Sequence, residues 1–142
     1  MSIYLLSTQS LLDTLTNEPA MKAWKATVPA SSIKLSSISI GLALNDIAEV
    51  RDSNEKDELN DALDKTIQSV KIYDGIVPFD AALVWSKLMR MKKLLHQDGP
   101  DPIEVSSESR MVVATALDKG FTLVDAPRPF HSAIPKLKVK SP

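Results

Sequence analysis

The segment that most constrains how this chain can fold is Met111–Val124, which reads MVVATALDKGFTLV. Its first part has the composition of an apolar helix. Gly120 is expected to end that helix, because glycine adopts left-handed backbone angles without strain. Phe121–Val124 then forms a short apolar run, which is typical of a strand covered on both faces. A helix that leads directly into a buried strand indicates an α/β fold with a parallel sheet.

Four further apolar segments have the pattern of short strands. They are Ile3–Leu6, Ile33–Leu35, Ile76–Val77 and a stretch around Leu137 and Val139. Amphipathic segments lie between them, and the clearest repeats its apolar residues at helical spacing from Leu59 to Val70. With 142 residues, the chain is long enough for one domain with a proper core and too short for two ordinary ones. We therefore predict a single α/β domain over residues 1–142, with a short parallel sheet and helices on both faces.

Polar residues mark where the helices are expected to begin, because short side chains with an oxygen can accept hydrogen bonds from free backbone N–H groups. The expected positions are Ser10, Asn17 with Pro19, Ser36 or Ser37, Asp80 and Ser107. The helix after Asp80 is predicted to continue as far as Leu95. The segment that follows, HQDGPDPIEV, is predicted to be a loop because of its glycine and proline residues.

The composition excludes several classes of function. The formal net charge is −1, so no overall positive field attracts nucleic acid or an anionic membrane. The chain has no cysteine, which excludes disulfides, thiolate zinc sites and cysteine nucleophiles. No apolar run is long enough to span a bilayer, and no basic segment precedes the first apolar residues as in a signal peptide. We therefore expect a cytoplasmic protein without a membrane anchor.

Sites in parallel α/β sheets form beyond the carboxyl ends of the strands. In this chain those positions fall in Ser7–Gln9, Ser36–Leu42, Ser107–Arg110 and Asp125–Arg128. Metal-dependent chemistry at such an edge needs carboxylates, because Mg²⁺ and Mn²⁺ prefer hard oxygen ligands. Most of these residues are neutral, so the sequence predicts a scaffold suited to a metal site but poor in ligands.

Four stretches cover nearly the whole chain and carry a family pattern in a fixed order. They are IYLLSTQ, LSSISIGLALNDIA, GIVPFDAALVW and MVVATALDKGFTLV. Together they resemble the PIN-domain family, in particular the VapC and FitB-like toxins of type II toxin–antitoxin, or plasmid-stability, systems. The resemblance implies a small α/β domain of the kind that cuts RNA with Mg²⁺ or Mn²⁺ held by several converging carboxylates.

The ligand positions of that family carry neutral residues in this chain. The resemblance places them on Ser7, Gln9, Leu42, Ser109 and Pro127. Only Thr8, between the first two, matches its family counterpart. The resemblance therefore implies a degenerate site with no dependable metal ligand.

Three acids near these positions are the remaining candidate ligands: Asp125, Asp46 and Glu108. Glu108 neighbours Ser109, but one residue along a helix rotates the side chain by about 100°, so it is expected to point elsewhere. Asp46 lies one helical turn after Leu42 and is displaced by roughly 6 Å along the axis. Asp125 directly follows the fourth strand and is the best of the three.

The early helices of the resembling family form a groove for the tail of the antitoxin. The corresponding apolar residues of this chain are Met21, Trp24, Leu44 and Ile47. Such a groove can hold an amphipathic helix and needs no metal. The resemblance therefore implies an antitoxin-like small protein as a partner. The sequence leaves a homodimer open as well.

Other polar residues have simpler interpretations. His96 and His131 lack an acidic partner at ligand spacing, so we expect solvated or locally bonded side chains. Ser7 has no nearby base in the sequence, and a helix-capping role is favoured over a nucleophile. The basic group Lys87, Arg90, Lys92 and Lys93 is expected to be a solvated helix face, with a remnant of a phosphate-binding rim as its functional alternative.

The leading hypothesis is a degenerate PIN-domain protein of the toxin–antitoxin type, which binds an antitoxin-like partner, needs no cofactor and lacks nuclease activity. It rests on the loss of acids at separate positions while the apolar framework is kept. The alternative is a Mg²⁺- or Mn²⁺-dependent ribonuclease that acts on RNA through Asp125 and a repositioned Asp46 or Glu108. A homo-oligomer with a purely structural role is a third reading.

Overall fold

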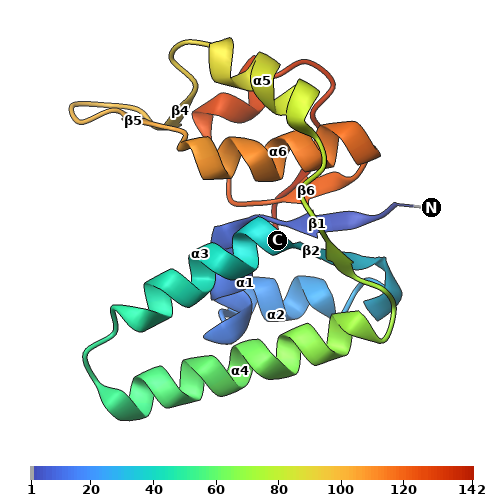
Figure 1. The fold of residues 1–142 in the computed structure, drawn as a ribbon, viewed down its shortest axis with the longest axis vertical. Coiled ribbons are helices and arrows are strands. Elements are labelled where there is room, and N and C mark those ends of the chain that lie inside the picture. The colour runs from blue at the N-terminus through green and yellow to red at the C-terminus, as the bar shows by residue number, and fades with distance from the viewer. Residues whose placement is uncertain (1) are drawn as a thin grey trace.

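The computed structural model describes residues 2–142 and contains one five-stranded sheet in the order β3-β2-β1-β6-β7 (Figure 1). All neighbouring strands of this sheet pair in parallel. The strands are β1 (Tyr4–Leu6), β2 (Ile33–Ser36), β3 (Ile76–Val77), β6 (Thr122–Val124) and β7 (Val139–Lys140). The predicted parallel α/β fold is therefore confirmed, including the short last strand.

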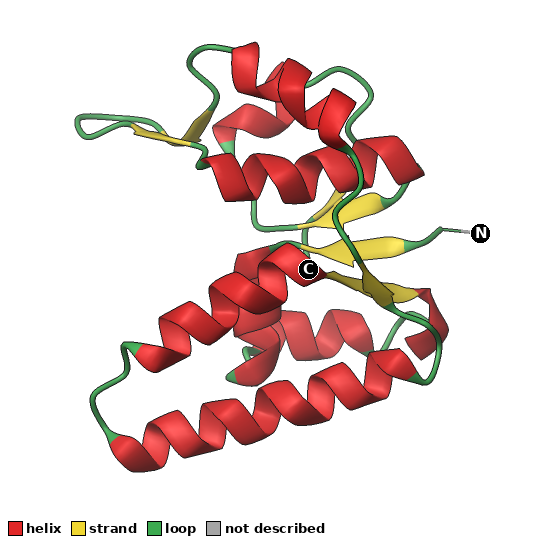
Figure 2. Cartoon of the chain, in the orientation of Figure 1, coloured by secondary structure: helices red, strands yellow, loops and turns green. Residues whose placement is uncertain are grey.

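Helices cover both faces of the sheet and form two lobes (Figure 2). The lower lobe, on one face, contains α1 (Thr8–Leu15), α2 (Pro19–Lys25), α3 (Ser37–Ala48) and α4 (Ser53–Lys71). The upper lobe, on the other face, contains α5 (Ala82–Arg90) and α6 (Ser107–Lys119). Two short 3₁₀ helices, η1 (Ala30–Ser32) and η2 (Pro129–Ala133), lie in connections. Within residues 2–142, no helix has both the length and the apolar character that crossing a bilayer requires.

The two lobes have separate hydrophobic cores, because successive residues of a strand point to opposite faces of the sheet. Leu5 of β1 and Leu123 of β6 belong to the upper core, packed against α5 and α6. Leu6 and Val124, the next residues along these strands, belong to the lower core. The continuous apolar runs in the sequence thus supply both cores at once, as expected for a sheet covered on both sides.

The register of the central strands determines which residues meet at the edge of the sheet. Leu6 of β1 lies opposite Val124 of β6, and the backbone N–H of Ser7 donates to the carbonyl of Val124 at 3.0 Å. Ser7 and Asp125, the residues that follow these strands, are consequently neighbours although they are far apart in the sequence.

Helix starts differ from the sequence prediction by one to three residues at several places. Ser7, not Ser10, caps α1, since its Oγ accepts a hydrogen bond from the N–H of Ser10 at 3.1 Å. Glu18 rather than Asn17 caps α2, and Ser106 rather than Ser107 caps α6. Several candidate capping residues stand close together at each of these sites, so the sequence signal did not resolve the position.

The predicted cap of α5 is wrong for a different reason. Asp80 forms an ion pair with Lys119 of α6 at 3.0 Å, and the residue before α5 is Ala81, which makes no capping bond. By contrast, the predicted cap at Ser36 and the predicted stop at Gly120 are confirmed, the latter with φ 70°. The carboxylate of Asp80, which the local sequence predicted as the cap of α5, therefore forms a long-range ion pair instead.

The segment predicted as the end of a helix and a loop is a small hairpin. The helix α5 ends at Arg90 instead of Leu95, and β4 (Leu95–Gln97) pairs with β5 (Ile103–Glu104) in antiparallel orientation. Gly99, with φ 102°, lies in the connection between the two strands. The glycine and proline content correctly indicated a turn, but a turn between two very short strands has the same composition as a loop.

Arg110 is buried in the upper lobe and was not singled out by the sequence. Its side chain donates to three backbone carbonyls, those of Val105 (3.0 Å), Leu88 (2.6 Å) and Met91 (2.9 Å). Two of these carbonyls lie at the C-terminal end of α5, where carbonyl groups have few backbone partners. That of Leu88 also accepts a bond from the N–H of Met91 at 3.2 Å. Arg110 therefore holds the end of α5 against the start of α6.

Gly75 occupies a position in which a side chain has no room. A Cβ atom at this residue would lie 2.7 Å from the carbonyl oxygen and 2.9 Å from the Cβ of Val70, closer than such atoms approach. We expect Gly75→Ala to destabilise the protein by about 1–3 kcal/mol, because the end of α4 must move away from the sheet. Urea unfolding followed by circular dichroism measures this.

Gly41→Ala is the matched control for this prediction. Gly41 lies within α3, and nothing approaches within 4 Å of the position that its Cβ would take. Because alanine favours a helix over glycine, we expect Gly41→Ala to stabilise the protein by about 0.5–1 kcal/mol. Equal changes in the free energy of unfolding for Gly75→Ala and Gly41→Ala would contradict the steric crowding described at Gly75.

Candidate functional site

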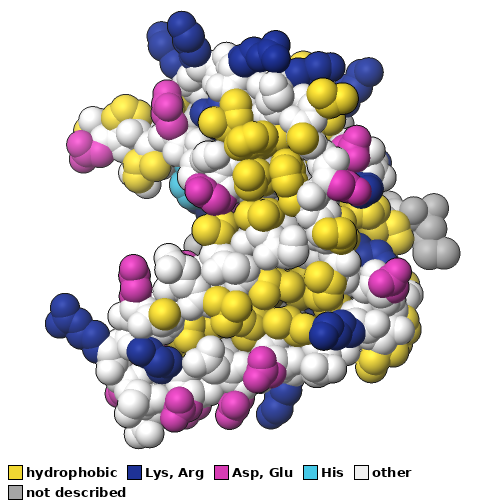
Figure 3. Space-filling model, in the orientation of Figure 1, with side chains coloured by type: hydrophobic (Ala, Val, Ile, Leu, Met, Phe, Trp, Pro, Cys, Tyr) yellow, Lys and Arg dark blue, Asp and Glu magenta, His cyan; other side chains and the backbone are white. Residues whose placement is uncertain are grey.

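A cavity of about 170 Å³ opens at the carboxyl ends of β1 and β6, between the two lobes. Figure 3 shows the molecule hollowed at this side, with a histidine at the edge of the hollow. Residues from α1, α3, α6 and β4 line the cavity, and its polar lining residues include Ser7, Thr8, Gln9, Asp46, Ser109 and Asp125. This is the edge at which the sequence predicted a site.

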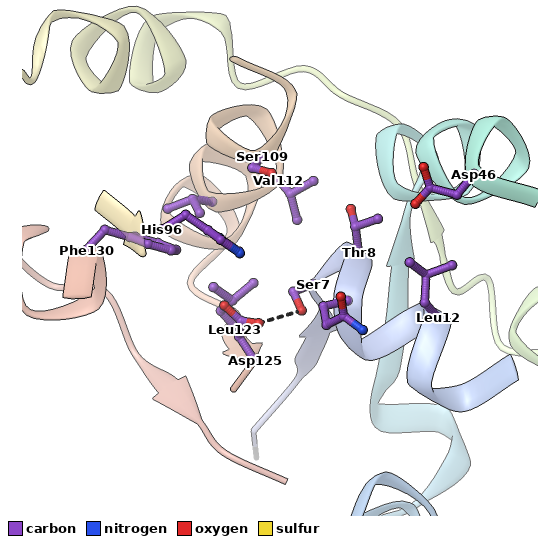
Figure 4. Close-up of a pocket in the computed structure, with 12 residues that line it drawn as sticks. Ser7, Thr8, Leu12, Asp46, His96, Ser109, Val112, Leu123, Asp125 and Phe130 are labelled. Atoms are coloured by element: carbon purple, nitrogen blue, oxygen red, sulfur yellow. Dashed lines mark hydrogen bonds between the residues drawn. The ribbon is translucent and has the colours of Figure 1, made fainter. Parts of the chain in front are cut away.

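Asp125 lies at the base of the cavity and is almost completely buried, with 4% of its surface exposed. Its Oδ1 accepts a hydrogen bond from the Oγ of Ser7 at 3.0 Å (Figure 4). The same hydroxyl accepts the capping bond of α1 from Ser10. Ser7 thus links the carboxylate to the start of the first helix.

The other oxygen of Asp125 faces two basic side chains. Oδ2 lies 3.0 Å from Nε2 of His131 and 3.7 Å from Nε of Arg128. Nδ1 of His131 accepts a hydrogen bond from the backbone N–H of Arg128 at 3.3 Å, which leaves Nε2 as the protonated nitrogen that donates to Asp125. The negative charge of Asp125 is therefore balanced from within the chain.

Neither histidine has an acidic partner at ligand spacing in the sequence, but the structure brings Asp125 to His131. The pair is missed because η2 turns the chain back after Asp125, and this turn brings His131 to the carboxylate from six positions further along. The more general expectation of a locally bonded histidine is confirmed for this residue.

The order of these groups does not make Ser7 a nucleophile of the Ser–His–acid type. In that type an imidazole lies between the hydroxyl and the carboxylate and accepts the proton of the hydroxyl. Here the carboxylate of Asp125 lies between Ser7 and His131. The capping role predicted for Ser7 is confirmed by its bond to Ser10.

His96 of β4 also lines the cavity, together with Phe130. Burial is the largest cause that lowers the pKa of His96, and the positive charge of Arg128 lowers it further, whereas Asp125 opposes the shift. His96 is consequently neutral at neutral pH and adds no positive charge to the cavity.

The positions at which the family resemblance placed ligands are dispersed. Ser7, Gln9 and Ser109 line the cavity, but Leu42 and Pro127 do not. Gln9 is exposed and donates to Asp13 of its own helix at 2.9 Å. Three of the five positions therefore reach the cavity, where they supply hydroxyl and amide groups.

The three remaining acids do not converge. Glu108 is exposed and absent from the lining, whereas Asp46 lines the cavity from α3, on the side opposite Asp125 (Figure 4). Within residues 2–142, no group of three or more aspartate, glutamate or histidine side chains is placed to hold a metal ion. The groups around the cavity are mainly hydroxyls. Of its two carboxylates, Asp125 is already engaged by Arg128 and His131 and Asp46 lies on the opposite side, so the lining does not fit a Mg²⁺ or Mn²⁺ site.

Three of the four residues predicted to bind a partner are enclosed in the lower core. Met21, Trp24 and Ile47 expose 0%, 7% and 2% of their surface, and the ring of Trp24 packs edge-on against Tyr4 with centroids 5.1 Å apart. An apolar helix face next to a sheet is buried by its own domain first, which explains their position. Leu44 is 49% exposed, and its partner-binding role stays a prediction.

The basic group of the upper lobe is exposed. Lys87 and Arg90 lie on α5, whereas Lys92 and Lys93 follow its end. Within the described part of the chain, none of the four forms an ion pair. They have the surroundings of a solvated face, as expected from the sequence.

Comparison with known proteins gives a likeness in structure alone. No family model and no curated protein matches the chain. One solved structure with a similar fold is VapBC2 from Rickettsia felis, bound to a DNA fragment from the VapBC2 promoter. It has TM-score 0.75 and 18% identity, with 98% of each chain covered. FitAcB from Neisseria gonorrhoeae has TM-score 0.73 and 19% identity, over 96% of each chain.

A third similar structure is VapBC-5 from Mycobacterium tuberculosis, a member of the VapBC family of toxin–antitoxin systems. It has TM-score 0.62 and 12% identity, and covers 99% of this chain and 98% of its own. At such identities the likeness establishes the fold, so the chain has the fold of the VapC- and FitB-like PIN domains. The fold expected from the four sequence stretches is confirmed.

Proposed function

We propose that this chain is a PIN-domain protein of the toxin–antitoxin type that binds an antitoxin-like small protein and does not cleave RNA with a metal. The similar solved structures are VapBC and FitAB complexes, which supports a partner of that kind. The absence of metal-dependent cleavage is supported by the contacts of Asp125 with Ser7, Arg128 and His131.

The charge around Asp125 argues against a cation site. A divalent cation gains most from several free carboxylates, and neutral oxygens replace these poorly. Arg128 lies 3.7 Å from the Asp125 carboxylate, so an incoming cation would meet a positive charge beside its best ligand. Asp46, on the opposite side of the cavity, would have to move toward Asp125 to share an ion.

The lower lobe offers a surface on which a partner can bind without any metal. Figure 3 shows a band of hydrophobic side chains between α3 and α4, bordered by charged residues. Leu44 of α3 is half exposed, and Ile40, Leu59 and Ile67 are only partly buried against the lower core. An amphipathic helix of the partner could cover such a band with its apolar face.

A direct test of the catalytic half combines Mn²⁺ titration by calorimetry with an RNA cleavage assay. We expect no Mn²⁺ binding in the millimolar range or tighter, and no cleavage that EDTA abolishes, because the donors do not converge. Asp46→Asn is the informative variant, since Asp46 is exposed and its loss leaves the fold intact. Cleavage that requires Mn²⁺ and disappears in Asp46→Asn would establish the ribonuclease alternative.

The partner half is tested by expressing the tagged chain together with the DNA that flanks its gene. We expect a small protein to copurify, and Leu44→Asp to weaken the complex at least about tenfold, because a charge would then face an apolar surface. Ile72→Asp is the matched control, since Ile72 is 77% exposed and lies just beyond the end of α4. Copurification unaffected by Leu44→Asp would place the partner elsewhere, and a chain that is purified alone would contradict the proposal.

A further inference from the structure

A second cavity, of about 240 Å³, lies under the sheet in the lower lobe, and we call it the lower cavity. Its apolar walls come from strands β1 and β2 and from α4, and include Leu6, Ile33, Leu35 and Val70. It is separate from the cavity that contains Asp125, with which it shares no lining residue.

The hydroxyl groups that line the lower cavity are already bonded. Thr14 donates to the carbonyl of Ser10 at 2.9 Å, Thr66 to that of Ala62 at 2.8 Å, and Ser69 to that of Thr66 at 2.8 Å. These donor groups are therefore satisfied within their own helices. The cavity consequently presents an apolar interior to a ligand.

The lining of the lower cavity includes a lysine side chain. Lys25, in the last turn of α2, lines this cavity and also lines an adjoining hollow of about 90 Å³ that contains Lys22 and Asn17. In the part of the chain that the structure describes, neither lysine has an ion-pair partner. An apolar interior thus continues, past Thr14 and Lys25, into a small polar space with two positive charges.

Lys25 is half-buried, and this burial lowers the pKa of its ammonium group. Partial removal from water without a counter-ion disfavours the charged form. An anion held at this position would therefore be attracted more strongly than at an exposed lysine.

We propose that the lower cavity binds a small amphipathic carboxylate, with its apolar tail inside the cavity and its carboxylate at Lys25 and Lys22. The volume suits this, since apolar cavities of about 150 Å³ remain dry and accept benzene. A neutral apolar molecule would leave the two lysines unpaired, and a polyanion would leave the apolar interior unfilled. The proposal goes beyond the proposed function, because it requires neither a partner protein nor a particular outcome for the metal site.

Octanoate is a suitable probe, with 1-octanol as its uncharged counterpart. We expect calorimetry to show saturable binding of octanoate, and Lys25→Met to weaken it about tenfold or more, because a hydrogen bond to a charged group is lost. Binding of 1-octanol should be similar in both proteins, since methionine keeps the length and apolar character of the lysine stem. Lys65→Met, which removes an exposed charge from α4 away from the cavity lining, should bind octanoate like the unchanged protein.

Ala30→Trp gives a second, independent arm. Ala30 is exposed and lines the lower cavity, so a tryptophan can occupy the cavity without entering the core of the domain. We expect this variant to keep the circular dichroism spectrum of the unchanged protein and to lose octanoate binding. No binding of octanoate at millimolar concentration overturns the proposal, as does equal affinity in the unchanged protein and in Lys25→Met.

Discussion

Replacing Arg110 by methionine is expected to lower the free energy of unfolding by about 2–5 kcal/mol, because buried backbone carbonyls lose a charged hydrogen-bond donor. The Arg110 side chain is 6% exposed and donates to three backbone carbonyls. A buried carbonyl that loses its donor costs about 1–3 kcal/mol. Methionine supplies no donor, so the carbonyls of Val105 and Met91 lose this bond, whereas that of Leu88 keeps the bond from the N–H of Met91 at 3.2 Å.

The position of these carbonyls makes Arg110 unusual among buried charges. Within residues 2–142 it forms no ion pair with a carboxylate, so the negative end of the α5 dipole and the three carbonyls take that role. Its removal should therefore loosen the junction of α5 with α6 as well as remove individual bonds.

Urea unfolding monitored by circular dichroism measures the effect of Arg110→Met. Arg110→Lys should recover only part of the loss, because a lysine keeps the charge but lacks the planar fork that reaches several acceptors. Arg51→Met is the matched control and should change stability by less than about 0.5 kcal/mol, since Arg51 is exposed. A loss below about 1 kcal/mol for Arg110→Met would contradict the role assigned to the guanidinium.

Asp125→Asn is expected to destabilise the protein by about 3 kcal/mol, because it leaves the positive charge of Arg128 without its counter-ion in a largely buried place. Whether Asp125→Asn lowers or raises stability distinguishes a carboxylate paired with a positive charge from one that belongs to a metal site. Carboxylates that converge to hold a metal repel one another without the ion, so neutralising one of them leaves stability unchanged or raises it. In this chain the carboxylate pairs with the positive charge of Arg128 and accepts hydrogen bonds from Ser7 and His131, so its loss should lower stability.

A double-mutant cycle isolates the pair. We expect Arg128→Gln to be less costly in the Asp125→Asn background than in the unchanged protein, with a coupling of about 1–3 kcal/mol, because the two side chains contact each other. Ser7→Ala should couple to Asp125→Asn as well, through the bond at 3.0 Å. Stabilisation by Asp125→Asn in metal-free buffer would contradict a structural role for this carboxylate.

The fold could be predicted largely because its signals are local. The apolar runs at Ile3–Leu6 and Phe121–Val124 are too short for helices and too apolar for exposed strands, and Gly120 takes the left-handed angles expected of it. The hairpin of β4 and β5 was missed because strands of two or three residues carry almost no periodic signal.

The sequence predicted the sheet edge at which the candidate site lies, but not the contacts between its side chains. Parallel strand ends identify the edge of the sheet, which brought Ser7 and Asp125 into consideration. The contacts of Arg110 and His131 depend on how distant segments pack, and no spacing rule reveals them. One signal was available for Arg110: a single charged residue directly before the apolar run Met111–Ala116 on a buried helix.

The sheet order has a consequence for how the chain reaches its native state. The central strand β1 lies between β2 and β6, and the hydrogen bond between Ser7 and Asp125 joins residues 118 positions apart. Contacts of such long separation form slowly, since the intervening segment must first be brought together. On the ribosome, β1 therefore gains its second neighbour only after α6 has emerged, and until then one edge of a hydrophobic strand is open to chaperones and to other nascent chains.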